Sequence, residues 1–175
     1  MQKNEEAGAA VPREERAALS KEACVKSAVL MKNDGGLLPL SEKENGAVTG
    51  ALARQMRFQG AGSSLVNARC VSLVDAMEQN GHAYVNYAPG YSLQDPRPSE
   101  KLEQQAVEFA GTAGTVLYVM GLTDVFESEG YDRTHLRLPD NQVHLLRAMA
   151  QVHPRIVVAL LGGAPVGMPW WGSVK

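Results

Sequence analysis

Four carboxylates lie within residues 124–132, directly after the apolar run at 116–122; they are Asp124, Glu127, Glu129 and Asp132. Like charges at this spacing raise the free energy of a folded chain unless a cation, a ligand or a proton relieves them. Two carboxylates that flank one bond can hydrolyse a glycoside, one as the acid/base and the other as the nucleophile. A solvated acidic turn is the competing interpretation, and composition alone slightly favours it. The choice between an active-site loop and a solvated turn therefore depends on where the neighbouring strands and helices place this loop.

Four apolar runs alternate with helical patterns along the chain. The runs typical of strands cover residues 46–53, 82–90, 115–122 and 155–166, and the helical patterns cover 13–31, 71–80, 99–110 and 140–153. Strands separated by helices at this rhythm predict a mostly parallel α/β sheet. Ligands of such sheets bind beyond the carboxyl ends of the strands. The acidic loop follows the third predicted strand at that edge, which is a reason to look there for function.

A glycine- and serine-rich loop, residues 58–67, follows the first predicted strand at the same edge. Its centre, Gly60 to Ser64, could hold a phosphate through backbone N–H groups. It lacks the lysine of a P-loop and the GxGxxG spacing, however, which makes nucleotide binding a weak prediction. A tight loop that needs glycine torsions is the leading alternative. The third alternative is a loop that brings the hydroxyl of Ser63 or Ser64 to a polar ligand.

Composition argues against several classes of partner. The formal net charge is −2, the pI is near 6.1 and the basic residues are scattered, so neither nucleic acid nor an anionic membrane surface is an expected partner. No run approaches the ~18 apolar residues of a membrane-spanning helix. The amino terminus lacks the apolar core of a signal peptide. A soluble, cytoplasmic chain is therefore expected.

Cysteine and histidine do not occur at the spacings of a metal site. Cys24 and Cys70 form no zinc motif, and Cys24 lies in an apolar helical pattern that predicts a buried free thiol. His135 and His144 are nine residues apart without a matching carboxylate pattern, so they are expected at the surface. Neither a metal nor a cofactor is expected.

Four motifs carry a resemblance to a known family. They are "AVLMKNDGGLLPL" at 28–40, "FQGAGSSLVN" at 58–67, "VFESEGYDRTHLRLPDNQ" at 125–142 and "VVALLGGAPVGMPW" at 157–170. In this order and spacing they resemble the second domain of glycoside hydrolase family 3, of the β-glucosidase type. The resemblance implies a three-layer α/β/α sandwich with a mostly parallel sheet, here incomplete. It divides the chain into a flexible lead-in, residues 1–12, and a partial domain, residues 13–175.

The family resemblance also implies roles for individual residues. Enzymes of this family retain anomeric configuration; a (β/α)8-barrel domain supplies the aspartate nucleophile, and the sandwich domain supplies the acid/base glutamate. That glutamate corresponds to Glu129. Glu127 is its neighbour, which would help to keep Glu129 protonated by repulsion, and it is the alternative acid/base. Ser63, or Ser64 beside it, is implied as a contact to the sugar. Asp132 and Arg133 are expected to form a local charge pair.

Two expectations follow from what the sequence does not contain. Because neither a barrel nor an "SDW"-type aspartate motif is found, the chain alone is expected to lack glycosidase activity. Its expected partner is a family 3 barrel domain, and the expected substrate of the two together is a β-glucoside or oligosaccharide. Because the family continues beyond the motif at 157–170, an exposed sheet edge and self-association, measurable by sedimentation, are expected. The alternative function is a non-catalytic sugar-binding or interaction module of the same fold.

Overall fold

The computed structural model describes residues 11–41, 43–57, 70–82 and 86–174. Contacts divide the chain between Asn33 and Asp34 into two units, and each is described by itself. The first unit contains helix α1, Arg13–Ser27. The helix ends four residues before the predicted end at Met31, and none of its residues is buried. The prediction of a buried thiol at Cys24 is wrong: this side chain is exposed, because the helix buries no face in a core.

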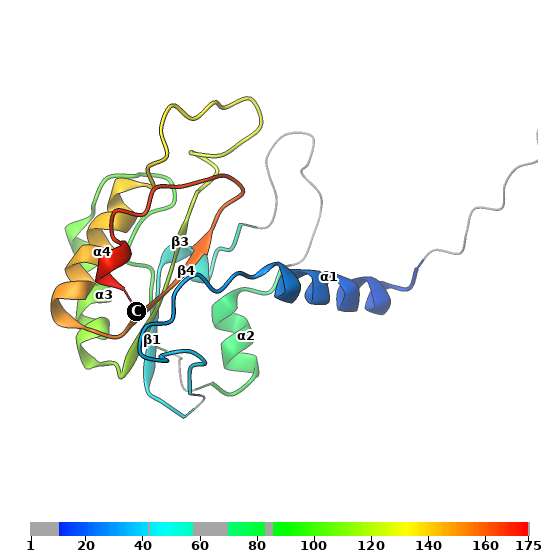
Figure 1. Cartoon of the computed structure of the whole chain (residues 1–175), viewed down its shortest axis with the longest axis horizontal. Helices are drawn as coiled ribbons and strands as arrows, with labels where there is room; N and C mark the ends of the chain where they lie inside the picture. The colour runs from blue at the N-terminus through cyan, green and yellow to red at the C-terminus, as the bar shows by residue number, and fades with distance from the viewer. Residues whose placement is uncertain (1–10, 42, 58–69, 83–85, 175) are drawn as a thin grey trace, which may run out of the picture. The chain divides into compact units, whose positions relative to one another are not determined.

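The second unit is built on a parallel sheet of four strands: β1, Gly46–Thr49; β2, Asn86–Ala88; β3, Thr115–Gly121; and β4, Ile156–Leu161. Their order in the sheet is β2-β1-β3-β4, and every neighbouring pair is parallel (Figure 1). Each strand lies within one of the four apolar runs. The predicted α/β fold with a mostly parallel sheet is therefore confirmed.

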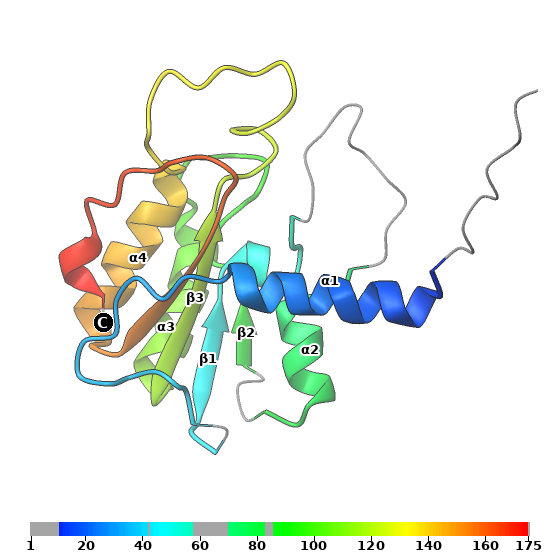
Figure 2. The same cartoon turned by 45° about the vertical axis from the view of Figure 1, so that its right-hand side comes forward.

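Helices cover both faces of this sheet. Helix α3, Glu100–Thr112, and helix α4, Asp140–Val152, lie side by side on one face, whereas α2, Leu73–Gln79, lies on the other (Figures 1 and 2). The short helices η1, Ala51–Ala53, and η3, Trp171–Ser173, follow β1 and β4. Ser72 caps α2, since its Oγ accepts a hydrogen bond from the backbone N–H of Asp75 at 3.0 Å. The layers are those of an α/β/α sandwich.

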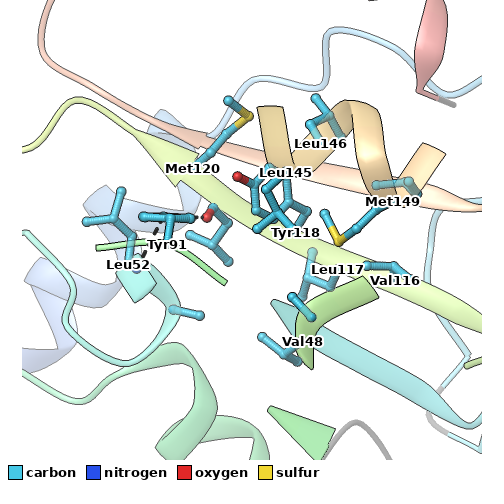
Figure 3. Packing of buried hydrophobic residues seen from close by; sticks show 14 of the residues in the cluster. Val48, Leu52, Tyr91, Val116, Leu117, Tyr118, Met120, Leu145, Leu146 and Met149 are labelled. Atoms are coloured by element: carbon cyan, nitrogen blue, oxygen red, sulfur yellow. Dashed lines mark hydrogen bonds between the residues drawn. The ribbon is translucent and has the colours of Figure 1, made fainter. Parts of the chain in front are cut away.

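The core lies between the sheet and the pair α3 and α4. All seven residues of β3 are buried, as expected for a strand covered on both faces. Tyr118 of this strand packs among Leu145, Leu146 and Met149 of α4, and its ring meets the edge of Tyr91 at a centroid distance of 6.2 Å (Figure 3). This packing fixes β3, and with it the start of the acidic loop.

Side chains complete the hydrogen bonding of β3 where β1 ends. The last pair of the β1–β3 ladder joins Thr49 to Tyr118. Beyond it, the hydroxyl of Tyr91 donates to the carbonyl of Val119 at 2.8 Å, and burial raises the pKa of this tyrosine, which keeps the donor proton in place. The buried amide of Gln142 accepts from the N–H of Gly121 at 2.8 Å and donates to its carbonyl at 2.9 Å. The sheet can therefore open between β1 and β3 without leaving these backbone groups unsatisfied.

Replacement of Gln142 by methionine is expected to lower the free energy of unfolding by about 2–4 kcal/mol, because two buried backbone groups of Gly121 lose their partners. Urea unfolding followed by circular dichroism measures this change. Gln151→Met is the matched control, since Gln151 is exposed on the same helix. Equal unfolding midpoints for the two variants would contradict the assigned role of Gln142.

Strand β4 lies at one edge of the sheet. It pairs with β3 only, and among the described residues no strand pairs with its other side. Residues 158–161 are half-buried. The expected exposed edge and self-association through it stay predictions.

Candidate active site

The order of the strands creates a crevice between β1 and β3. The chain passes from β1 to β2 in one direction and from β3 to β4 in the other, so the connections diverge between these two central strands. Ligands of open α/β sheets bind at such a point, beyond the carboxyl ends. The segments that leave the sheet here are residues 50–57 and the acidic loop, residues 122–139. A hollow of about 240 Å³ lies between them, lined by Leu52, Gln55, Met56, Arg57, Leu93, Gln94, Thr123, Asp124 and Val125.

Gly50 allows β1 to leave the sheet at this point. Its φ is +108°, a conformation that residues with a side chain rarely adopt. A Cβ atom here would lie 2.0 Å from the carbonyl oxygen of Val119. The backbone N–H of Gly50 donates to Ala88 of β2 at 3.1 Å. The chain then turns through η1 and reaches Arg57 at the crevice.

Arg57 connects the segment after β1 with the acidic loop. Its Nη1 pairs with Oε2 of Glu127, and its Nη2 donates to the backbone carbonyl of Glu127. Its Nε lies 2.9 Å from Oδ1 of Asp124, an ion pair that is not aligned for a hydrogen bond. The side chains of Arg57 and Glu127 are only 16% and 20% exposed, whereas that of Asp124 is 74% exposed. The pair with Glu127 is therefore the shielded one.

Glu127 also contacts the loop that follows β4. Its Oε2 accepts a hydrogen bond from the backbone N–H of Gly163 at 3.1 Å. The backbone N–H groups of Phe126 and Glu127 both donate to the carbonyl of Thr123, at 2.8 and 2.9 Å, which forms a turn directly after β3. We call Arg57, Asp124, Glu127 and the N–H of Gly163 the Arg57 cluster. It joins the loops that follow β1, β3 and β4.

Glu129 lies two residues further along the acidic loop and is exposed. The backbone N–H of Tyr131 donates to the carbonyl of Ser128 at 3.1 Å, and Gly130 between them has a φ of +82°. A hollow of about 360 Å³ is lined by Arg57, Phe126, Glu127, Ser128, Glu129, Tyr131, Arg133 and Ala164. The two glutamates thus differ in their surroundings: Glu127 belongs to the Arg57 cluster, and Glu129 lies at a surface that a second molecule can reach.

Arg133 does not form the expected charge pair with Asp132. Its Nη1 donates to the carbonyl of Pro165 at 3.1 Å and its Nη2 to that of Arg137 at 3.3 Å. No ion pair joins it to Asp132 among the residues that the structure describes, so this prediction is wrong. These two hydrogen bonds engage the Nη atoms, while the buried Nε has no hydrogen-bond partner among the described residues, and they tie the second half of the acidic loop to the segment after β4. The N–H of Gly167 donates to Leu136 at 2.7 Å and strengthens the same connection.

The other predicted residues lie as follows. Ser63 and Ser64 lie outside the described residues, so their contact to a sugar stays a prediction. Nδ1 of His144 on α4 lies 2.5 Å from Oε2 of Glu103 on α3. In the described part of the chain, no three histidine, cysteine, aspartate or glutamate side chains are placed to hold a metal ion. No helix of the described residues is long and apolar enough to cross a membrane.

Arg57 is the site residue that the sequence interpretation missed. It follows the first strand and directly precedes the glycine- and serine-rich loop, which places it at the predicted ligand-binding edge. Its position was a usable signal. Its partner was not predictable, because Glu127 lies 70 residues further along the chain.

Comparison with known proteins shows the family of this chain. The family model described as "Glycosyl hydrolase family 3 C-terminal domain" matches residues 28–175. The chain belongs to glycoside hydrolase family 3. Among curated relatives, it is 39% identical over 160 residues to thermostable beta-glucosidase B of Acetivibrio thermocellus; the match covers 90% of this chain and 21% of that protein. It is 34% identical over 165 residues to an exo-alpha-(1->6)-L-arabinopyranosidase of Bifidobacterium longum, covering 88% and 22%.

Solved structures of beta-glucosidases share the fold. The crystal structure of a family 3 beta-glucosidase from Bifidobacterium adolescentis superposes with a TM-score of 0.88 at 37% identity, covering 94% of this chain and 24% of that one. A beta-glucosidase from Kluyveromyces marxianus, solved in complex with glucose, has the same fold with a TM-score of 0.81 at 15% identity, covering 92% and 38%. This family 3 domain spans about a fifth of the length of the two curated relatives.

Proposed function

We propose that this family 3 domain contributes the acid/base loop of a retaining β-glucosidase that removes terminal β-linked glucose from oligosaccharides or aryl glycosides. Glu129 is the acid/base in this proposal. The observation that carries it is the contrast between the two glutamates of the acidic loop. Glu129 is exposed beside a hollow at the carboxyl edge of the sheet, whereas Glu127 is held by Arg57 and Gly163.

The proposed reaction has two steps. In the first, an aspartate of a barrel domain attacks the anomeric carbon, and Glu129 gives its proton to the glycosidic oxygen as the bond to the leaving group breaks. In the second, the Glu129 carboxylate takes a proton from water, and the resulting hydroxide oxygen replaces the aspartate at the anomeric carbon. The two inversions restore the original configuration. Ser63 and Ser64 remain proposed contacts to the sugar.

The environment of Glu127 changes the role that we assign to it. The sequence suggested that Glu127 keeps Glu129 protonated through repulsion or replaces it as acid/base. Its ion pair with Arg57 offsets its negative charge and weakens such repulsion. We therefore propose that Glu127 mainly fixes the loop.

The partner in this proposal is a family 3 barrel domain. One carboxylate cannot complete a double displacement, so this chain without that partner is expected to be inactive. The choice of sugar is a property of the complete enzyme, because similar chains occur in relatives named as a beta-glucosidase and as an exo-alpha-(1->6)-L-arabinopyranosidase.

A complementation experiment tests the proposed function. The 175-residue chain alone is expected to release no nitrophenol from nitrophenyl β-glucoside. A hybrid enzyme, in which this chain replaces the matching segment of thermostable beta-glucosidase B, is expected to release it. If the chain alone hydrolyses the substrate and Glu129→Gln abolishes this activity, the proposed division of the two carboxylates between two domains is contradicted. Binding of glucose by the chain, together with an inactive but folded hybrid, would favour the non-catalytic sugar-binding module.

A further inference from the structure

We infer that Arg57 and Glu127 are positioning residues that hold the acid/base loop, and that Glu127 does not transfer a proton itself. This inference rests on the proposed function of Glu129. It assigns a role to Arg57, which lies outside the acidic loop, and removes Glu127 as the alternative acid/base.

Three loops meet at the Arg57 cluster. Arg57 comes from the segment after β1, Glu127 from the loop after β3 and Gly163 from the loop after β4. Loss of Arg57 therefore removes its hydrogen bonds to Glu127 and its ion pair with Asp124, which connect the segment after β1 to the acidic loop.

The contact between Arg57 and Glu127, which we call the clamp, involves both the side chain and the main chain of Glu127. One guanidinium nitrogen binds the carboxylate of Glu127, and the other binds the backbone carbonyl of the same residue. The contact thus fixes the main chain as well as the side chain. Both side chains are mostly shielded from water, which strengthens a charge-assisted hydrogen bond. A lysine offers a single point charge and cannot reproduce the two contacts.

Two donors already occupy Oε2 of Glu127. It accepts from Arg57 and from the N–H of Gly163. The carboxylate of Glu127 is thus engaged in holding the loops together. We therefore assign proton transfer to Glu129, whose side chain is exposed.

The fixed main chain of Glu127 determines where Glu129 lies. Only Ser128 separates them, and the turn from Ser128 to Tyr131 begins directly after the anchored carbonyl. A displacement of a catalytic group by about 1 Å can cost about 10²-fold in rate. We therefore expect loss of the clamp to lower kcat with little change in KM for a small aryl glucoside.

Hydrogen exchange of the 175-residue chain tests the clamp without reference to activity. Arg57→Lys and Glu127→Gln are expected to accelerate amide exchange in residues 122–131 at least tenfold. Arg54→Lys is the matched control, because Arg54 lies three residues before Arg57 and also pairs with two carboxylates, Asp75 and Glu78, on α2. Unchanged exchange in both Arg57→Lys and Glu127→Gln would overturn the inference.

Azide distinguishes positioning from proton transfer in the hybrid enzyme. The leaving group of a dinitrophenyl glucoside needs no proton, so the glycosyl-enzyme still forms when the acid/base is lost. Its hydrolysis is then slow because no base activates water. Azide anion needs no base and can react in place of water. Glu127→Ala is expected to lower kcat about 10- to 100-fold with no recovery in azide. Recovery of Glu127→Ala by azide would overturn the inference. If no glutamate variant responds to azide but hydrogen exchange changes as expected, the proposed acid/base role fails while the clamp stands.

Discussion

Replacement of Glu129 by glutamine in the hybrid enzyme is expected to lower kcat/KM about 10³-fold for a disaccharide of β-linked glucose, within the usual range for loss of a general acid. A sugar leaving group cannot depart without a proton, whereas a dinitrophenolate can. The loss of kcat/KM for dinitrophenyl glucoside should therefore be less than tenfold, because this constant reports the first step only. Steady-state kinetics with both substrates measures the difference.

Asp132→Asn is the matched control for this experiment. Asp132 is an exposed carboxylate on the same loop, three residues from Glu129, and its replacement should change neither constant appreciably. Equal losses for the two substrates in Glu129→Gln would indicate a role in sugar binding or folding rather than in proton transfer.

Replacement of Gly50 by alanine is expected to lower the free energy of unfolding by about 2–5 kcal/mol. The positive φ costs about 1–2 kcal/mol for a residue with a Cβ atom, and the contact with the carbonyl of Val119 adds about 1–3 kcal/mol of overpacking. Urea unfolding measures the loss. Because the carbonyl of Val119 belongs to β3, separation of β1 from β3 should also disturb the Arg57 cluster.

Gly111→Ala is the control for this substitution. Gly111 lies in α3, and a Cβ atom there would meet no atom within 4 Å. Alanine should stabilise this helix by up to about 1 kcal/mol. A Gly50→Ala variant with an unchanged unfolding midpoint would show that β1 can leave the sheet without the conformation found here.

The sequence predicted the strands well because their apolar patterns are local. The continuous run that became β3 indicated burial on both faces, and all seven of its residues are buried. The sequence predicted helix α1 too long, because the end of this helix depends on contacts that are not local. Its periodicity described an apolar face but could not show whether a core exists to cover it, and the helix ends at Ser27 with no buried residue.

The candidate site was predictable only in part. The acidic loop and its position at the carboxyl edge followed from the order of strands and turns. The contacts that differentiate Glu127 from Glu129 did not, because they involve residues far away in the chain. Arg57 and Gly163 reach Glu127 across 70 and 36 positions, and Gln142 reaches Gly121 across 21. A polar residue in sequence shows what it can bind, and only the fold shows what it does bind.

The most direct test of Glu129 as the acid/base is the product that the hybrid enzyme with Glu129→Ala forms from dinitrophenyl β-glucoside in azide. The predicted result is faster turnover and accumulation of β-glucosyl azide, since azide attacks the glycosyl-enzyme from the face that water would use. Formation of α-glucosyl azide, or turnover that azide does not change while the hybrid remains folded, would contradict the assignment.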